Sequence, residues 1–171
     1  MKQLVMYSSQ TGNTKLIAEI IHAELPADKD IVAEGVQFDP DAYDVLYIGY
    51  HIEKGTCSDA VKQLLSQLHH KKVALFGTMG SPSNGEYGQQ LSHDIAAMLP
   101  EDNTLLGEFI CQGKIAPSFK ARYMVQLQQD PNNEQIMKQL DTYEQSQSHP
   151  DENDQKQAKA FAQLCISQYL N

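Results

Sequence analysis

Short apolar runs alternate along this chain with stretches in which apolar residues recur at helical spacing. The apolar runs are expected to be strands at 2–7, 31–35, 44–49, 72–77 and 105–111. The helical stretches have these apolar faces: Leu16, Ile17, Ile20, Ile21 and Leu25; Val61, Leu64, Leu65 and Leu68; Leu91, Ile95, Met98 and Leu99; and Ala158, Phe161, Ala162, Cys165 and Tyr169. Strands that alternate with helices form right-handed crossovers and a parallel sheet. The pattern predicts an α/β fold of three layers, with helices on both faces of a doubly wound sheet of five parallel strands.

One stretch departs from this alternation. Residues 113–152 separate the fifth strand from the last helix, a gap far longer than an ordinary connection. The stretch is rich in Gln, and Ile136, Met137, Leu140 and Tyr143 have the spacing of a short helix. We expect a single domain over 1–171 with an inserted, partly helical segment at about 113–152, lying against one end of the sheet. A mobile tether is the alternative.

Charge and cysteine content restrict the function. The chain has 171 residues, with 13 Lys and Arg against 22 Asp and Glu, and a net charge of −9. Binding to nucleic acid or to an anionic membrane needs basic residues and is therefore not expected. Cys57, Cys111 and Cys165 are far apart and form no CxxC pair, which indicates reduced thiols in a cytoplasm and no cysteine metal site. The His residues also lack partners at ligand spacing, so no metal is expected.

The strongest local signal lies between the first strand and the first helix, at 8–14. Hydroxyl residues surround Gly12 where the helix begins, and a helix N-terminus attracts anions through its unpaired N–H groups. Ser9, Thr11 and Thr14 offer hydroxyls, and Gly12 allows close approach of the backbone. This pattern favours a phosphate held by neutral donors. It is neither a Walker loop nor a GxGxxG fingerprint, and a Ser- and Thr-rich helix cap is the alternative.

Two further loops follow the third and fourth strands, at 49–56 and 77–88. For strand order 2-1-3-4-5 the order reverses between strands one and three, and ligands bind beyond the carboxyl ends of strands at such a point. We therefore expect all three loops to converge on one site. Tyr50, His51 or Tyr87 would stack on a flat heteroaromatic ligand, with half-exposed loop residues as the alternative.

These residues resemble a known family. The run Ser9-Gln10-Thr11-Gly12-Asn13-Thr14 matches the [ST]-x-T-G-N-T phosphate motif of the flavodoxins, and the resemblance covers 1–112 and resumes in the last helix. It implies the flavodoxin-like fold and FMN as cofactor. The family often places Trp in the loop after the third strand; this chain has none, so Tyr50 or His51 would take that place. The implied cofactor-binding residues are Ser9, Gln10, Thr11, Gly12, Asn13 and Thr14; Tyr50, His51, Ile52, Lys54 and Gly55; and Thr78, Met79, Gly80 and Tyr87.

A finer resemblance concerns function. The segments YIGYHIEKGT, ALFGTMGS, GEFICQGKI and HPDENDQKQAKAF look like the flavodoxin-like proteins encoded beside bacterial bilirubin reductases. This implies an FMN electron carrier that passes electrons to a partner reductase, in tetrapyrrole reduction. A stand-alone FMN-dependent NAD(P)H oxidoreductase acting on a quinone, a flavin or a tetrapyrrole stays open, because the inserted segment at 113–152 would give such an enzyme a substrate wall. An interaction module without cofactor also stays open. No spacing singles out a catalytic acid and base pair. The sequence also leaves open whether the chain forms a homodimer.

Overall fold

A computed structural model describes residues 1–170. Five parallel strands form one sheet in the order β2-β1-β3-β4-β5, as predicted. The strands are β1 (Gln3–Tyr7), β2 (Lys29–Ala33), β3 (Val45–His51), β4 (Lys72–Met79) and β5 (Thr104–Gln112). The predicted second strand was two residues late, because its weakly apolar sequence, with all five residues only half-buried, gives no sharp boundary.

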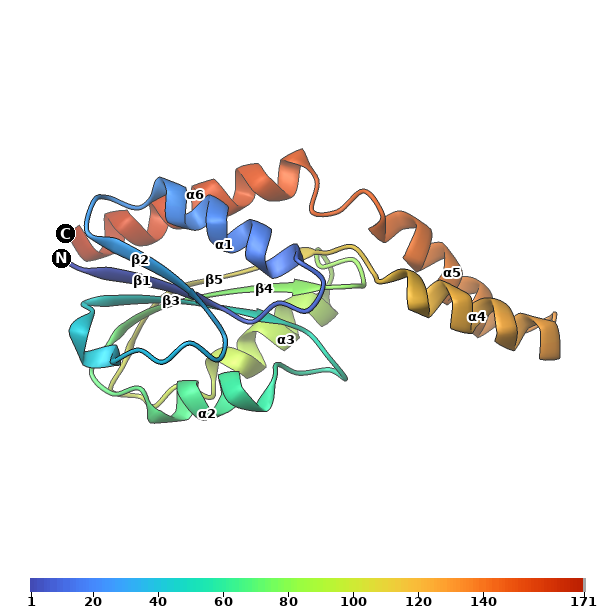
Figure 1. Ribbon diagram of the computed structural model, residues 1–171, viewed down its shortest axis with the longest axis horizontal. Helices are drawn as coiled ribbons and strands as arrows, with labels where there is room; N and C mark the ends of the chain where they lie inside the picture. Colours follow the sequence, from blue (N-terminus) through green and yellow to red (C-terminus); the bar gives the residue numbers. More distant parts are fainter. Residues whose placement is uncertain (171) are drawn as a thin grey trace.

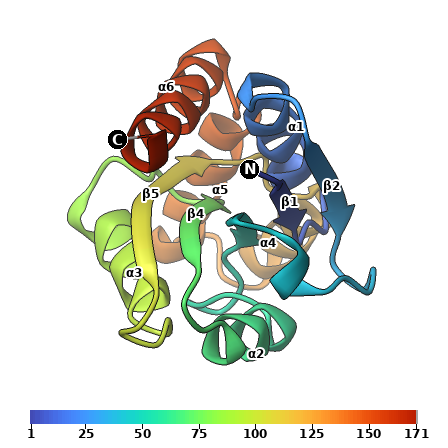
Figure 2. The same cartoon turned by 90° about the vertical axis from the view of Figure 1, so that its left-hand side faces the viewer.

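Helices cover both faces of the sheet (Figure 1). Helices α1 (Asn13–Glu24) and α6 (Glu152–Leu170) lie on one face, and α2 (Asp59–Gln67) and α3 (Glu86–Ala96) lie on the other. Seen end-on, the twisted sheet separates these two pairs (Figure 2). A short 3-10 turn, Pro40–Ala42, precedes β3.

The inserted segment is a pair of helices, α4 (Pro117–Gln129) and α5 (Glu134–Ser146). We call this pair the helical hairpin. It projects beyond the carboxyl ends of the strands, away from both chain termini (Figure 1). The helix predicted around Ile136–Tyr143 is confirmed as part of α5, whereas α4 was missed because it buries no residue and its apolar residues form no stripe.

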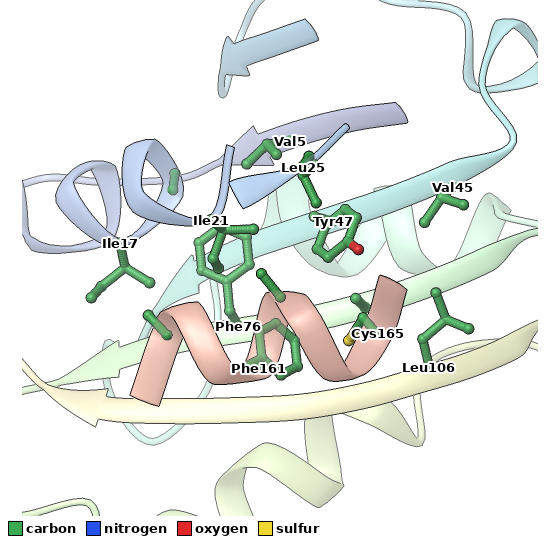
Figure 3. Close-up of a cluster of buried hydrophobic side chains, with 14 of the residues drawn as sticks. Val5, Ile17, Ile21, Leu25, Val45, Tyr47, Phe76, Leu106, Phe161 and Cys165 are labelled. Atoms are coloured by element: carbon green, nitrogen blue, oxygen red, sulfur yellow. The ribbon is translucent and has the colours of Figure 1, made fainter. Parts of the chain in front are cut away.

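Side chains of β3 alternate between two cores. Tyr47 packs with Ile17, Phe76 and Phe161 on the α1 and α6 face (Figure 3), and Tyr50 packs with residues of α2 and α3 on the other. This alternation follows from the strand period of two. Strands buried on both faces explain why the central runs lack polar residues.

Two glycines make this packing possible. In the register of β3 and β4, Gly49 lies opposite Phe76 and Gly77 lies opposite Tyr50. A Cβ atom on Gly49 would lie 2.3 Å from the Phe76 ring, and one on Gly77 would lie 2.3 Å from the Tyr50 ring. Each glycine thus leaves room for the aromatic ring of the neighbouring strand.

Among residues 1–170, no helix has the length and apolar character needed to cross a membrane.

Candidate functional site

A cavity of about 620 Å³ opens at the carboxyl ends of the strands. Its size falls in the range of small-molecule and cofactor sites. Of the predicted binding residues, those that line it are Gln10, Thr11, Asn13, His51, Ile52, Lys54, Thr78, Met79, Gly80 and Tyr87. The three predicted loops therefore converge on one site, at the reversal of strand order between β1 and β3.

The loop after β1 presents the N-terminus of α1 to this cavity. Gly12 is the N-cap residue, with φ at 89°, and no side chain caps the helix. That φ favours glycine, and a Cβ there would meet no atom within 4 Å, so the loop is open on this side. The uncapped N–H groups and the helix dipole suit an anion.

Side-chain hydrogen bonds fix the loop. Ser9 Oγ accepts from the Gly12 N–H at 3.2 Å, and Asn13 Nδ2 donates to Thr11 Oγ1 at 2.9 Å. Thr14 is buried, and its Oγ1 lies 2.8 Å from Thr78 Oγ1 on β4. Ser9, Gly12 and Thr14 do not line the cavity, so in this structure Ser9 and Thr14 hold the loop while Thr11 and Asn13 face the open space.

The loop after β3 decides which aromatic residue faces the cavity. Tyr50 and His51 were the two residues predicted as alternatives for stacking on the ligand, and Tyr50 is wrong as the choice, because its side chain is fully buried in the α2 and α3 core. Strand alternation explains the error: the next residue, His51, points the other way and lines the cavity. The His51 Nδ1 atom lies 3.3 Å from Ser8 Oγ, and its Nε2 atom is buried without a hydrogen-bond partner among residues 1–170.

Lys54 and Gly55 form the tip of this loop. Glu53 and Thr56 exchange backbone hydrogen bonds of 2.8 and 3.1 Å, and φ is 51° at Lys54 and 78° at Gly55. Positive φ at both central residues is the signature of a type I′ two-residue turn. The turn exposes Lys54 and brings Gly55 opposite Tyr87, whose hydroxyl lies 3.9 Å from where a Gly55 Cβ would be.

The helical hairpin supplies a fourth wall, in agreement with the wall expected of the inserted segment, although none of its individual residues was predicted to line the site. The cavity lining that comes from 113–116 and from the two hairpin helices is Gly113, Lys114, Ile115, Ala116, Phe119, Arg122, Tyr123, Gln139 and Thr142. Glu53 and Ser81 also line the cavity and were not predicted. The sequence indicated the location of this wall only through the position of the insertion, which follows the carboxyl end of β5 and therefore starts beside the predicted site.

Direct contacts join the base of the hairpin to the predicted loops. Asn13 Nδ2 donates a second bond, of 2.9 Å, to the Lys114 carbonyl oxygen. A Cβ atom on Gly80 would lie 2.9 Å from Ile115 Cγ1, so the loop after β4 packs closely on this base. The Ile115 N–H in turn donates to Ser146 Oγ at 3.1 Å, which anchors the end of α5.

The chain matches a model of the flavodoxin domain over residues 4–163. It belongs to the flavodoxin family. It is 49% identical over 166 residues to the flavodoxin-like domain-containing protein BilS of Clostridioides difficile (strain CD3), covering 95% of this chain and 94% of that protein. BilS of Clostridium symbiosum (strain WAL-14163) is 28% identical over 186 residues, covering 98% of this chain and 95% of that protein.

Solved flavodoxins share the fold. A flavodoxin from Streptococcus pneumoniae TIGR4 aligns with a TM-score of 0.63 at 15% identity, over 98% of this chain and 99% of that one. An archaeal flavodoxin aligns with a TM-score of 0.60 at 14% identity, over the full length of both chains. The predicted flavodoxin-like architecture is confirmed.

FMN is the cofactor of this flavodoxin, and the residues at the cavity fit it. The unpaired backbone N–H groups at the uncapped α1 N-terminus and the Thr11 hydroxyl offer neutral donors for a phosphate, while the Asn13 amide fixes the Thr11 side chain. His51 Nε2, which makes no hydrogen bond within residues 1–170 and lies 3.9 Å from Glu53 Oε2, offers a polar atom to a flat heterocycle, and the face of Tyr87 offers a ring. The cluster of His149, Asp151 and Asp154 needs no ligand, because Asp151 and Asp154 exchange backbone-to-side-chain bonds of 2.8 and 2.9 Å that cap α6.

We expect all three cysteines to be unreactive in the folded protein. Cys57, Cys111 and Cys165 are free and buried. Burial raises the pKa of each thiol, that of Cys165 to about 12, so little thiolate exists at neutral pH. Ellman's reagent at pH 7.5 should titrate no thiol within minutes in buffer and all three in urea. Rapid reaction of Cys57 alone would show that the loop beside the cavity opens.

Proposed function

We propose that this flavodoxin is an FMN electron carrier that delivers electrons to a partner reductase. The observation that carries the proposal is the convergence of the phosphate loop and the loops after β3 and β4 on one cavity with an exposed rim. Lys54, Gly55 and Tyr87 at that rim are exposed, so a partner protein reaches the cofactor region from solvent. Bound FMN supplies reversible electron uptake, and the protein binds it and sets its potential.

The chain's own residues have distinct roles in this proposal. The Thr11 hydroxyl and the backbone N–H groups at the start of α1 hold the phosphate without a cationic side chain, and the Asn13 amide orients Thr11. His51 and Tyr87 bound the ring, and the Lys54–Gly55 turn lets a backbone peptide group reorient toward it, because Gly55 tolerates unusual φ values. No pair of groups is required as acid and base.

We further propose that the partner acts in tetrapyrrole reduction, such as that of bilirubin. The support is the 49% identity to BilS and the resemblance to flavodoxin-like proteins encoded beside bilirubin reductases. Three free, buried cysteines are consistent with work in a reducing cytoplasm. Sedimentation equilibrium of the FMN-loaded protein would test whether it forms a homodimer, which the sequence leaves open.

Replacing Lys54 with Glu should lower the midpoint potential of the bound FMN. Lys54 lines the cavity, and a cation there favours electron addition while an anion opposes it. Reversal of this one exposed charge should shift the potential by on the order of tens of millivolts, measured by dye-coupled redox titration. Lys156→Glu makes the same charge change on α6 outside the cavity lining and serves as the control. Equal shifts of the midpoint potential in both variants would show that the change depends on the net charge of the protein and not on the position of Lys54.

A stand-alone FMN-dependent NAD(P)H oxidoreductase is the second candidate. One observation favours it: the helical hairpin gives the cavity an extra wall, with Phe119, Arg122 and Tyr123 facing the space. Such a wall suits a substrate. The third possibility is an interaction module without cofactor. Membership of the flavodoxin family, whose cofactor is FMN, argues against it.

Anaerobic reduction assays separate the two candidates. The protein is loaded with FMN, desalted and mixed with NADH or NADPH, alone and with a separate NADPH-dependent flavin reductase. Bleaching of the flavin bands only with the reductase supports the carrier. Steady NAD(P)H consumption by the protein alone, with a quinone or bilirubin as acceptor, would support the oxidoreductase and contradict the carrier.

A further inference from the structure

The cavity has a half that the cofactor motifs do not account for. The phosphate loop and the loops after β3 and β4 line one side, and the helical hairpin lines the other. On the hairpin side the lining side chains are an arginine and two aromatic residues from the first two turns of α4, with Gln139 and Thr142 from α5. This combination differs from the neutral hydroxyl and amide donors of the phosphate loop.

Arg122 is the only arginine in the sequence. Its guanidinium carbon lies 4.8 Å from the centre of the Phe119 ring and 5.8 Å from that of Tyr123. Within residues 1–170 it forms no ion pair with any carboxylate. Stacking against rings orients a guanidinium while its N–H groups stay free to donate at the edge.

The neighbouring cation on α4 has a different arrangement. Lys120 pairs with Glu144 of α5, and its ammonium lies 5.4 Å from the centre of the Tyr143 ring. Lys120 thus fastens the two helices together, which leaves Arg122 as the cation of α4 that faces the cavity. The pairing of one cation and not the other indicates that Arg122 is not needed for packing of the hairpin.

The surroundings of Arg122 also favour an anion. Lys114 lines the same half of the cavity, and so does Ala116, the N-cap residue of α4, which provides no side-chain cap. Two cations and a helix N-terminus therefore gather here in a chain whose net charge is −9. Phe119, an exposed residue at 41% accessibility, adds an apolar surface.

We infer that the base of the hairpin is a second binding site, beside the FMN site, for a flat and largely apolar molecule that carries a carboxylate. Arg122 binds the carboxylate through two parallel N–H bonds, and Phe119 and Tyr123 contact the flat body. The site places such a molecule in the same cavity as the cofactor. Only the choice of a linear tetrapyrrole as the occupant rests on the proposed function.

The test measures binding of bilirubin to the FMN-loaded protein, by its induced circular dichroism, with bilirubin dimethyl ester as the probe that lacks free carboxylates. We expect wild type to bind bilirubin more tightly than the ester. Arg122→Gln should weaken bilirubin binding about ten- to hundredfold and leave ester binding unchanged, because it removes a charge-assisted bond. Arg122→Lys should recover only part of the loss. Lys138→Gln removes an exposed cation of α5 outside the cavity lining and should change neither affinity.

Three results would overturn the inference. Wild type that binds neither probe has no such site. Equal losses of bilirubin and ester in Arg122→Gln would show a packing role. Weaker binding of FMN, with riboflavin binding unchanged, would assign Arg122 to the cofactor phosphate. Failure of electron delivery to a reductase would instead refute the proposed function, and the two outcomes are measured separately.

Discussion

Replacing Thr11 with Asp is expected to abolish retention of FMN. Thr11 lines the cavity beside the uncapped N-terminus of α1, so the new carboxylate would face the phosphate. At about 4 Å and an effective dielectric constant near 20, two unit charges repel by about 4 kcal/mol, which is roughly a thousandfold in affinity. Fluorescence quenching of added FMN measures this loss directly.

A matched variant and a second ligand make this test specific. The carboxylate introduced by Thr11→Asp would still accept the hydrogen bond that Asn13 Nδ2 gives to Thr11 Oγ1, so the loop should keep its shape. Thr11→Asn introduces a side chain of the same size as Asp without the charge and should bind FMN within about tenfold of wild type. Riboflavin lacks the phosphate and should bind Thr11→Asp almost as well as wild type. An equal loss of both flavins would show that the loop had collapsed.

Replacing Gly77 with Ala should strongly lower the free energy of unfolding. The added Cβ would lie 2.3, 2.7 and 2.9 Å from three atoms of the Tyr50 ring, and that ring is fully buried. Overpacking of this kind costs about 3 kcal/mol of unfolding free energy, because the ring has no free volume into which to move. Urea denaturation of the apoprotein, followed by far-UV circular dichroism, gives the value.

A double-mutant cycle identifies the cause of that loss. Tyr50→Leu removes the ring, so Gly77→Ala should cost much less in that background than in wild type. Gly85→Ala adds a Cβ with no atom within 4 Å and should cost less than about 1 kcal/mol. Equal costs of Gly77→Ala with and without the Tyr50 ring would contradict the clash.

Most of the sheet could be predicted from sequence because its strands are apolar on both faces. The run at 72–77 has no polar alternation, and the structure buries β4 from Val73 to Met79. The strand order came from the family resemblance, and the phosphate motif carried that resemblance. These features are local in sequence or fixed by a short motif, which is why they could be predicted.

The errors at the site arise where function depends on which side a residue faces. Tyr50 and His51 are neighbours, and both suit a ring-stacking role by composition. Both residues lie in β3, where successive side chains point to opposite faces of the sheet. The Tyr50 side chain therefore points into the core and the His51 side chain faces the cavity. The end of β3 was predicted two residues early, at 49, so this alternation could not be extended to residues 50 and 51.

The residues that form the hairpin wall could not be predicted, because their contacts are long-range and polar; the sequence indicated only that the inserted segment would form a wall. Asn13 and Lys114 are separated by 101 positions, and a hydrogen bond from a side chain to a backbone carbonyl leaves no pattern in the sequence. Arg122 also lies in a part of the sequence that has no motif or spacing that would indicate a binding residue. Its place at the cavity depends on the path of the chain from 113 to 116, which the closely packed Gly80 and Ile115 determine.

The two hydrogen bonds of the Asn13 amide have a thermodynamic consequence. One reaches Thr11 in the phosphate loop and the other reaches Lys114 at the base of the hairpin. A single side chain thus couples the order of two segments, and coupling between sites is reciprocal. If FMN binding orders the hairpin by a given factor, any ligand or partner that orders the hairpin tightens FMN binding by the same factor. A partner reductase that bound the hairpin and ordered it would therefore also tighten the binding of FMN to this flavodoxin, which donates electrons to that reductase.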